Sequence, residues 1–112
     1  MADEPTAAGV TTWLVDEQVW QEDDETPGQV AMLVDSPTVQ VGLWKPGPGG
    51  LGPFDVDLEH TEILLVLSGT GQLEVDDEAQ VELTPGRAVR IDVGAHTRWT
   101  VNQEFTELWV YI

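Results

Sequence analysis

Two histidines and a short acidic segment are the residues of this chain whose types and spacing could support chemistry. The stretch from Phe54 to Gly71 reads FDVDLEHTEILLVLSGTG, so acids and one histidine come directly before an apolar run. Divalent Mn, Fe, Ni or Zn needs three or four imidazole and carboxylate ligands in one place. Asp57, His60, Glu62 and His96 are therefore a candidate metal set, with His60 or Asp57 serving as ligand or as acid/base group.

The elements that must position these residues are short strands. Segments rich in Val, Leu, Ile, Thr and Trp recur between turn signals. The strand candidates are residues 11–15, 29–35, 38–44, 62–69, 71–77, 79–86, 88–94, 96–101 and 105–112. Several alternate in polarity at a period of two, and none reaches the length of helical periodicity that would indicate a helix. We predict an all-β fold, a closed sandwich or jelly-roll barrel that hides its strand edges. Trp44, Trp99 and Trp109 fall on strand candidates, where we expect them in the core or an interface.

Strand alternation predicts which of the candidate residues face inward. If Glu62 begins a strand facing the interior, His60 and Leu64 share its parity, because successive side chains point to opposite faces. His96 and Arg98 share a parity on another strand. We therefore expect imidazole and carboxylate to meet inside the mouth of the barrel.

Three segments are expected to lie outside the sheets. Residues 45–53, KPGPGGLGP, carry Pro and Gly that interrupt any ladder and predict a loop. Residues 21–28, QEDDETPG, are expected to form an exposed loop, and residues 1–10 a flexible tail. The expected organisation is thus a tail at 1–10 and one domain at 11–112.

Composition excludes several partners. The 112 residues include 21 acids against 4 Lys plus Arg, a formal net charge of -17 that repels nucleic acids and anionic membranes. There is no cysteine, hence no disulfide, and no apolar run approaches the length needed to cross a bilayer. The first ten residues lack the features of a signal peptide, so we expect a cytoplasmic protein.

The spacing of several residues resembles the cupin superfamily. Glu62 is followed by Gly69, and Gly86 by Asp92, Val93-Gly94-Ala95 and His96. Within this superfamily, the chain is most similar to small RmlC-like cupins of the ethanolamine-utilisation and ureidoglycine type. The matching features are Gly42-Leu43-Trp44, Pro46-Gly47, Glu62 with Leu64 to Gly69, Pro85-Gly86, Trp99 and Leu108 to Ile112. The resemblance implies a cupin-type double-stranded β-helix over roughly residues 39 to 112.

The resemblance also implies site residues. Glu62 stands in a cupin metal-ligand position and His96 next to one, while Asp55-x-Asp57 occupies the place of the usual His-x-His pair, and Asp92 replaces a Pro. A small-molecule pocket is expected in the barrel, with Trp44 and Leu64 as lining and Arg98 as an anchor for a substrate carboxylate. Arg98 can equally pair with a surface acid.

Two functions remain open from the sequence. One is a metal-assisted enzyme acting on a small organic substrate, with Glu62 and His96 as ligands. The other is a non-catalytic cupin that needs no metal and binds a small ligand or acts as an accessory protein. In either case we expect a homodimer, formed through the apolar strands TTWLV or LWVYI or through a sheet face.

Overall fold

A computed structural model describes residues 3–5 and 9–112, and almost all of its regular structure is β-strand. The elements are β1 (Asp3–Pro5), β2 (Thr11–Trp13), the 3₁₀ turn η1 (Val15–Glu17), β3 (Gln21–Glu22), β4 (Gln29–Asp35), β5 (Gln40–Lys45), β6 (Leu51–Asp57), β7 (Glu62–Ser68), β8 (Gly71–Val75), β9 (Ala79–Leu83), β10 (Ala88–Ile91), β11 (His96–Val101) and β12 (Thr106–Tyr111). The predicted all-β class is confirmed.

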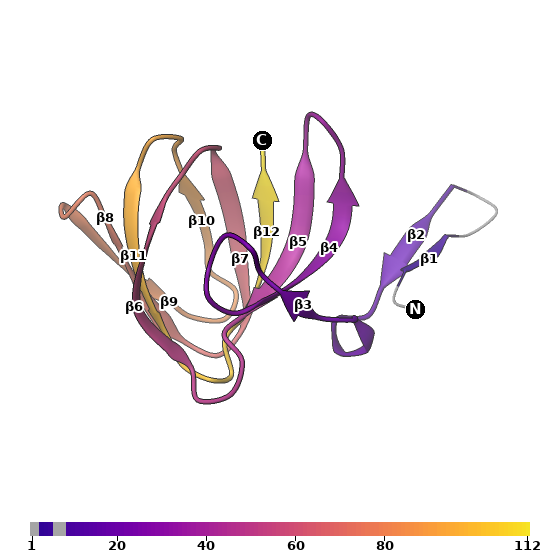
Figure 1. Ribbon diagram of the computed structural model, residues 1–112, viewed down its shortest axis with the longest axis horizontal. Helices are drawn as coiled ribbons and strands as arrows, with labels where there is room; N and C mark the ends of the chain where they lie inside the picture. Colours follow the sequence, from indigo (N-terminus) through magenta and orange to yellow (C-terminus); the bar gives the residue numbers. More distant parts are fainter. Residues whose placement is uncertain (1–2, 6–8) are drawn as a thin grey trace.

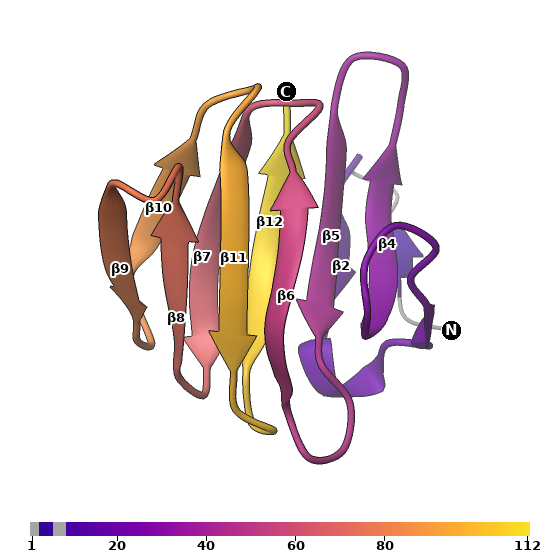
Figure 2. The ribbon, with the colours of Figure 1, turned by 60° about the vertical axis from the view of Figure 1, so that its left-hand side comes forward.

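Two antiparallel sheets face each other and form a jelly-roll barrel (Figures 1 and 2). The larger sheet has the order β10-β7-β12-β5-β4-β3, and the smaller sheet has the order β6-β11-β8-β9. Strands β7 and β12, neighbours in the larger sheet, therefore face β11 and its neighbours across the interior. The β1–β2 hairpin lies apart and projects from the barrel (Figure 1).

Strand β6 was not expected, because the sequence predicted a loop through Pro53. The loop ends earlier, and β6 begins at Leu51. A proline is tolerated there because β6 is at the edge of its sheet and pairs only with β11, so the missing N–H breaks no second ladder. In the expected N-terminal tail, residues 3–5 pair with β2, and residues 1, 2 and 6–8 lie outside the described part.

The core lies between the two sheets. Inward residues alternate along β7, where Glu62, Leu64 and Val66 are buried, and along β11, where Thr97 and Trp99 are buried. Trp44, Trp99 and Trp109, which we expected in core or interface, are all in the core cluster. Among the described residues, no helix is long and apolar enough to cross a membrane.

Candidate functional site

The interior of the barrel holds two carboxyl groups from neighbouring strands. Glu62 is the first residue of β7, and Glu107 lies on β12; each side chain is 4% exposed. The alternation of each strand turns them to the core side, where Glu107 stands opposite Trp44 in the ladder and Glu62 opposite Tyr111. Both border one interior cavity of about 40 Å³. Its lining residues are Asp23, Thr26, Trp44, Phe54, Val56, Glu62, Trp99, Glu107, Trp109 and Tyr111.

Burial changes the protonation of this pair. Desolvation raises the pKa of Glu62 to about 7. The pKa of Glu107 is raised well above its ordinary value, first by desolvation and then by the charge of Glu62. Among the described residues, Glu107 Oε1 is a buried side-chain oxygen without a hydrogen-bond partner. The pair therefore retains protons at neutral pH that solvent-exposed glutamates have lost.

Two tryptophan side chains that line the cavity are held in place by hydrogen bonds from their indole N–H groups. Trp44 Nε1 donates to Thr26 Oγ1 and to the Pro27 carbonyl, both at 3.1 Å. Trp99 Nε1 donates to Thr97 Oγ1 at 2.8 Å. Both indole N–H groups are thus satisfied by the protein, and Trp44 fixes the 23–28 segment against the barrel.

The segment 21–28 forms more than an exposed loop. Its first two residues are β3, and Asp23 and Thr26 line the cavity. Thr26 Oγ1 also donates to Asp23 Oδ2. This segment therefore covers part of the barrel opening.

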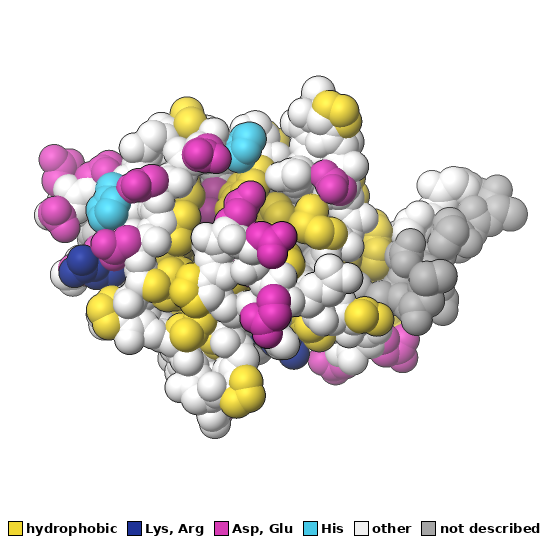
Figure 3. Space-filling model, viewed as in Figure 1, with side chains coloured by type: hydrophobic (Ala, Val, Ile, Leu, Met, Phe, Trp, Pro, Cys, Tyr) yellow, Lys and Arg dark blue, Asp and Glu magenta, His cyan; other side chains and the backbone are white. Residues whose placement is uncertain are grey.

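A wider acidic hollow of about 330 Å³ adjoins the cavity. The two spaces share Thr26, Val56 and Tyr111 as lining residues. Four acids border the hollow: Glu25 and Glu59, together with Asp55 and Asp57, whose carboxylates turn outward to Arg98 and His96. The cavity is thus approached through a strongly acidic mouth, and acidic side chains predominate over Lys and Arg on the face shown in Figure 3.

His60 lies at this mouth and not in the interior. Its ring stacks on Tyr111 with ring centroids 5.4 Å apart. The ring centroids of Tyr111 and Trp109 are in turn 4.6 Å apart. His60 shares the sequence parity of Glu62, but the chain bends at Glu59 and His60 before β7 begins, so the alternation does not extend to it. An aromatic column consequently runs from the mouth to the interior.

His96 and Asp57 lie on the outer face of the smaller sheet. His96 Nδ1 is 2.5 Å from Asp57 Oδ1, and its Nε2 is 3.5 Å from Asp55 Oδ2. These contacts raise the pKa of His96, with the hydrogen bond to Asp57 as the main cause. The expectation that His96 and Glu62 meet inside the barrel differs from the structure, because β11 buries Thr97 and Trp99 and so turns His96 outward.

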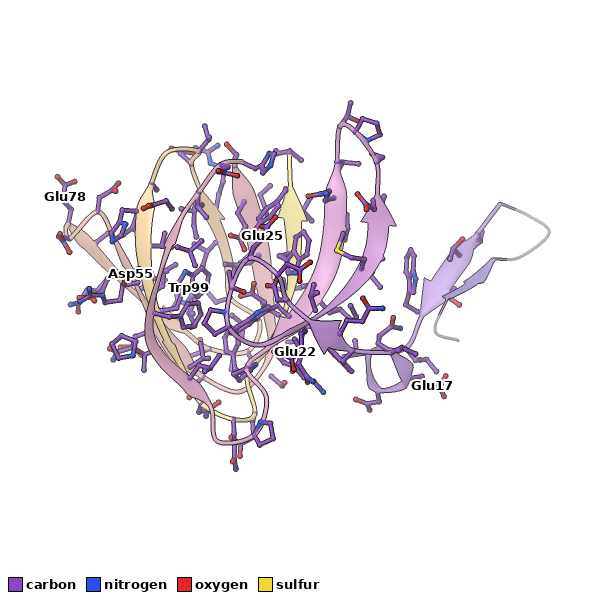
Figure 4. The ribbon with its side chains drawn as sticks, in the orientation of Figure 1. Glu17, Glu22, Glu25, Asp55, Glu78 and Trp99 are labelled. Atoms are coloured by element: carbon purple, nitrogen blue, oxygen red, sulfur yellow. The ribbon has the colours of Figure 1, made fainter. Side chains whose placement is uncertain are left out.

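Arg98 is also on the outside. Its Nε and Nη2 donate to Asp55 at 2.8 and 3.3 Å, and this pairing lowers the pKa of Asp55. Figure 4 shows Asp55 on the outer side of the barrel, away from Trp99 between the sheets. Arg98 is thus not placed to anchor a ligand in the cavity. Of the three expected pocket residues, Trp44 lines the cavity, and Leu64 is buried in the core cluster without lining it.

The expected metal set is not assembled. Among the residues that the structure describes, no group of three or more His, Asp or Glu converges as metal ligands. The cavity lining supplies the carboxyl groups of Asp23, Glu62 and Glu107, but these do not form such a group, and a divalent site needs three or four donor groups around one ion. The residues present do not fit a resident divalent metal.

Glu107 is the site residue that the sequence analysis missed. A signal was present, because Glu107 shares strand parity with Trp109, which was expected to be buried. A carboxyl on the core face of a strand is costly unless it has a partner or a functional role. Strand alternation alone therefore indicated Glu107 as a candidate site residue.

The family of the chain is established by comparison with known proteins. The family model described as "EutQ-like cupin domain" matches residues 34–107. The chain belongs to the EutQ-like cupins. The predicted resemblance to small cupins of the ethanolamine-utilisation type is confirmed.

Solved structures share the fold of this EutQ-like cupin. A EutQ-type ethanolamine utilization protein from Salmonella typhimurium is 16% identical, with a TM-score of 0.81 over 98% of this chain and 91% of that chain. EutQ from Clostridium difficile is 20% identical, with a TM-score of 0.75 over 98% and 92%. KdgF from Halomonas sp. is 20% identical, with a TM-score of 0.69 over 88% and 89%. None of the curated proteins compared matches the chain significantly.

Proposed function

We propose that this EutQ-like cupin is a non-catalytic protein that binds a small molecule in its interior cavity, without a resident metal ion. The observation that carries the proposal is the buried Glu62–Glu107 pair in an aromatic cavity, with Glu107 Oε1 unpartnered. A buried polar atom without a partner costs about 1–3 kcal/mol, and a ligand bound there removes that cost. Two of the structural neighbours carry the name of ethanolamine utilization proteins, which agrees with the handling of a small organic molecule.

A binding role follows better from the site than metal-assisted catalysis does. The two cupin ligand positions are divided between the inside and the outside of the barrel, because Glu62 is buried and His96 pairs with Asp57 on the outer face. A metal-dependent enzyme would need further metal ligands beside the Glu62–Glu107 pair. Elemental analysis of protein purified without chelators, and again after incubation with Mn, Fe, Ni and Zn, tests it; we expect no stoichiometric metal.

A second candidate is a metal-free acid/base enzyme. The raised pKa values of Glu62, to about 7, and of Glu107 give the pair a proton that can be exchanged near neutrality. Such a pair suits proton transfer on a small substrate. Turnover that is lost in both Glu62→Gln and Glu107→Gln, with ligand binding retained, would favour this candidate over a binding protein.

We also propose that the protein forms a homodimer through the outer face of its larger sheet. Ile63 and Leu67 on β7 are 39% and 37% exposed, and both alternate with core residues. The C-terminal strand LWVYI is not a free edge for pairing, because β12 lies between β7 and β5. Light scattering should give a dimer mass, and Leu67→Lys should lower it. A monomer mass in both low and high salt would refute this assembly.

Binding in the cavity can be tested without knowing the ligand. NMR spectra recorded with small cationic, neutral and anionic fragments should show at least one fragment that shifts the indole N–H resonances of Trp44 and Trp99. Val56→Phe places a larger side chain into the cavity lining and should abolish those shifts while the spectrum stays dispersed. If no fragment of any charge perturbs these resonances, the proposed function is refuted.

A further inference from the structure

We propose that the cavity recognises a small organic ammonium ion, whose charge lies at the Glu62 and Glu107 carboxyl groups and whose carbon atoms contact the surrounding tryptophan rings. The proposal rests on the proposed function, because it names the class of ligand that the same cavity binds. Four features of the described residues carry it: the charge of the lining, the aromatic walls, the unpartnered oxygen and the size of the space.

The lining fixes the sign of the ligand charge. Three carboxyl side chains, those of Asp23, Glu62 and Glu107, border the cavity, and no Lys, Arg or His is among its described lining residues. An anion would find no countercharge there. The acidic hollow at the mouth, bordered by Glu25 and Glu59 among others, further raises the local concentration of cations.

The aromatic walls distinguish an organic cation from a metal ion. Trp44, Trp99, Trp109 and Tyr111 line the same space as the two glutamates. The faces of such rings attract ammonium groups and pack against alkyl carbon. A divalent metal instead requires several oxygen or nitrogen ligands that converge on one point, and no three acids or histidines of the described residues do so. Trp44 and Trp99 already donate their indole N–H groups to protein oxygens, so they serve as apolar walls.

Glu107 Oε1 supplies the hydrogen-bonding position. It is buried and has no partner, although the cavity lies beside it. An ammonium group brings N–H donors and a positive charge together, so it satisfies this oxygen and compensates one carboxylate charge of the pair. A neutral alcohol can donate one hydrogen bond but cannot compensate the charge.

The cavity volume limits the ligand to a few heavy atoms. About 40 Å³ is open to the centre of a water molecule. At roughly 10–15 Å³ per water on this measure, the cavity holds about three waters. Ethylammonium has a matching number of heavy atoms, and a longer ligand would extend through the Thr26 and Tyr111 boundary into the outer hollow.

Binding should be linked to proton release. Asp23 on the covering segment and Tyr111 on β12 line the same cavity as the pair. Burial and the charges of Glu62, Glu25, Glu107 and Asp23 raise the pKa of Tyr111, and its ring stacks on His60 at the mouth. An ammonium ion favours ionised carboxylates, so the pair must lose a proton when the ion binds. Affinity should therefore rise with pH below the pKa of the pair, by up to tenfold for each pH unit and each proton released.

The experiment is an NMR titration with three probes of similar size: ethylammonium chloride, ethanol and sodium acetate. We expect saturable shifts of the Trp44 and Trp99 indole resonances with ethylammonium, at least tenfold tighter at pH 8.5 than at pH 5.5. Glu107→Gln and Glu62→Gln should each weaken this binding at least tenfold. Glu78→Gln, in the exposed β8–β9 turn, removes the same charge far from the cavity and should leave binding unchanged.

Equal or tighter binding of ethanol or acetate would overturn the proposal while leaving a ligand-binding cupin intact. Competition by potassium chloride at the same concentration would also overturn it, because the signal would then report general cation screening. Binding unchanged in both glutamine variants would place the ammonium ion elsewhere. If none of the three probes shifts the indole resonances, both the ammonium proposal and ligand binding in the cavity are refuted.

Discussion

The sharpest consequence of the buried pair is an inverted pH dependence of stability. Glu62 has a pKa of about 7 in the fold against 4.5 as its ordinary value. Between these values the folded state binds more protons than the unfolded chain. The contribution of Glu62 to stability should therefore be greatest below the ordinary pKa and be lost as the pH rises through about 7, and Glu107, whose pKa is also raised, adds a loss in the same direction. Substitution of Glu62 by Gln removes the Glu62 part of this dependence, since the amide keeps the shape and cannot ionise.

The size of the effect follows from the shift. Each pKa unit is worth about 1.4 kcal/mol, so ionising the Glu62 carboxyl in the fold costs about 3 kcal/mol relative to the unfolded chain. Because Glu62 and Glu107 influence each other, the measured loss belongs to the pair. A loss of about 3 kcal/mol is a large share of the stability of a domain of this size.

Urea unfolding at fixed ionic strength from pH 4.5 to 8.5 measures this directly. We expect the wild-type free energy of unfolding to fall by at least about 3 kcal/mol, and that of Glu62→Gln to fall less because only Glu107 still contributes. Glu78→Gln, which changes an exposed turn, controls for the removal of one charge from an acidic protein. A wild-type curve that rises or stays level from pH 4.5 to 8.5, or a Glu62→Gln curve parallel to it, would refute the reasoning.

Three further outcomes are expected. His96→Asn should lower the free energy of unfolding more at pH 5.5 than at pH 8.5. The raised pKa of His96 stabilises the fold below the ordinary pKa, and this stabilisation is lost as the pH rises through the pKa of the folded state. Urea unfolding curves at both pH values check this. Trp44→Phe should lose about 1 kcal/mol with the hydrogen bond to Thr26 and speed amide exchange in residues 23–28. Gly42→Ala should cost about 1–3 kcal/mol in thermal unfolding, because its Cβ would overlap the Trp109 indole.

Strand alternation predicted part of the site and failed where two of its own expectations conflicted. It placed Glu62 and Leu64 inside and expected burial of Trp99, and the structure agrees. It also placed His96 inside, although His96 and Trp99 are an odd number of positions apart on one strand and cannot share a face. The larger apolar side chain determines the orientation, because burying Trp99 gains more than burying an imidazole.

Other features depended on long-range packing that local patterns do not encode. Strand β6 contains Pro53 and reads as a continuation of a loop, but its edge position beside β11 makes the strand possible. The acidic segment before β4 contributes Thr26 and Asp23 to the cavity because the Trp44 indole, on β5, donates to Thr26. Neither relationship is visible in the spacing of residues along the chain.

The position of the second carboxyl is what separates this site from a metal centre. A cupin metal site requires imidazoles and a carboxylate that converge in the barrel, and here β11 presents Trp99 to the interior while His96 pairs with Asp57 outside. The partner of Glu62 is instead Glu107, from the neighbouring strand of the same sheet. A like-charged pair in an apolar cavity destabilises the fold at neutral pH, and apolar residues of similar size would remove that cost. Such groups are retained at sites of function, so the energetic cost of the pair is itself an argument that the cavity binds a ligand that compensates its charge.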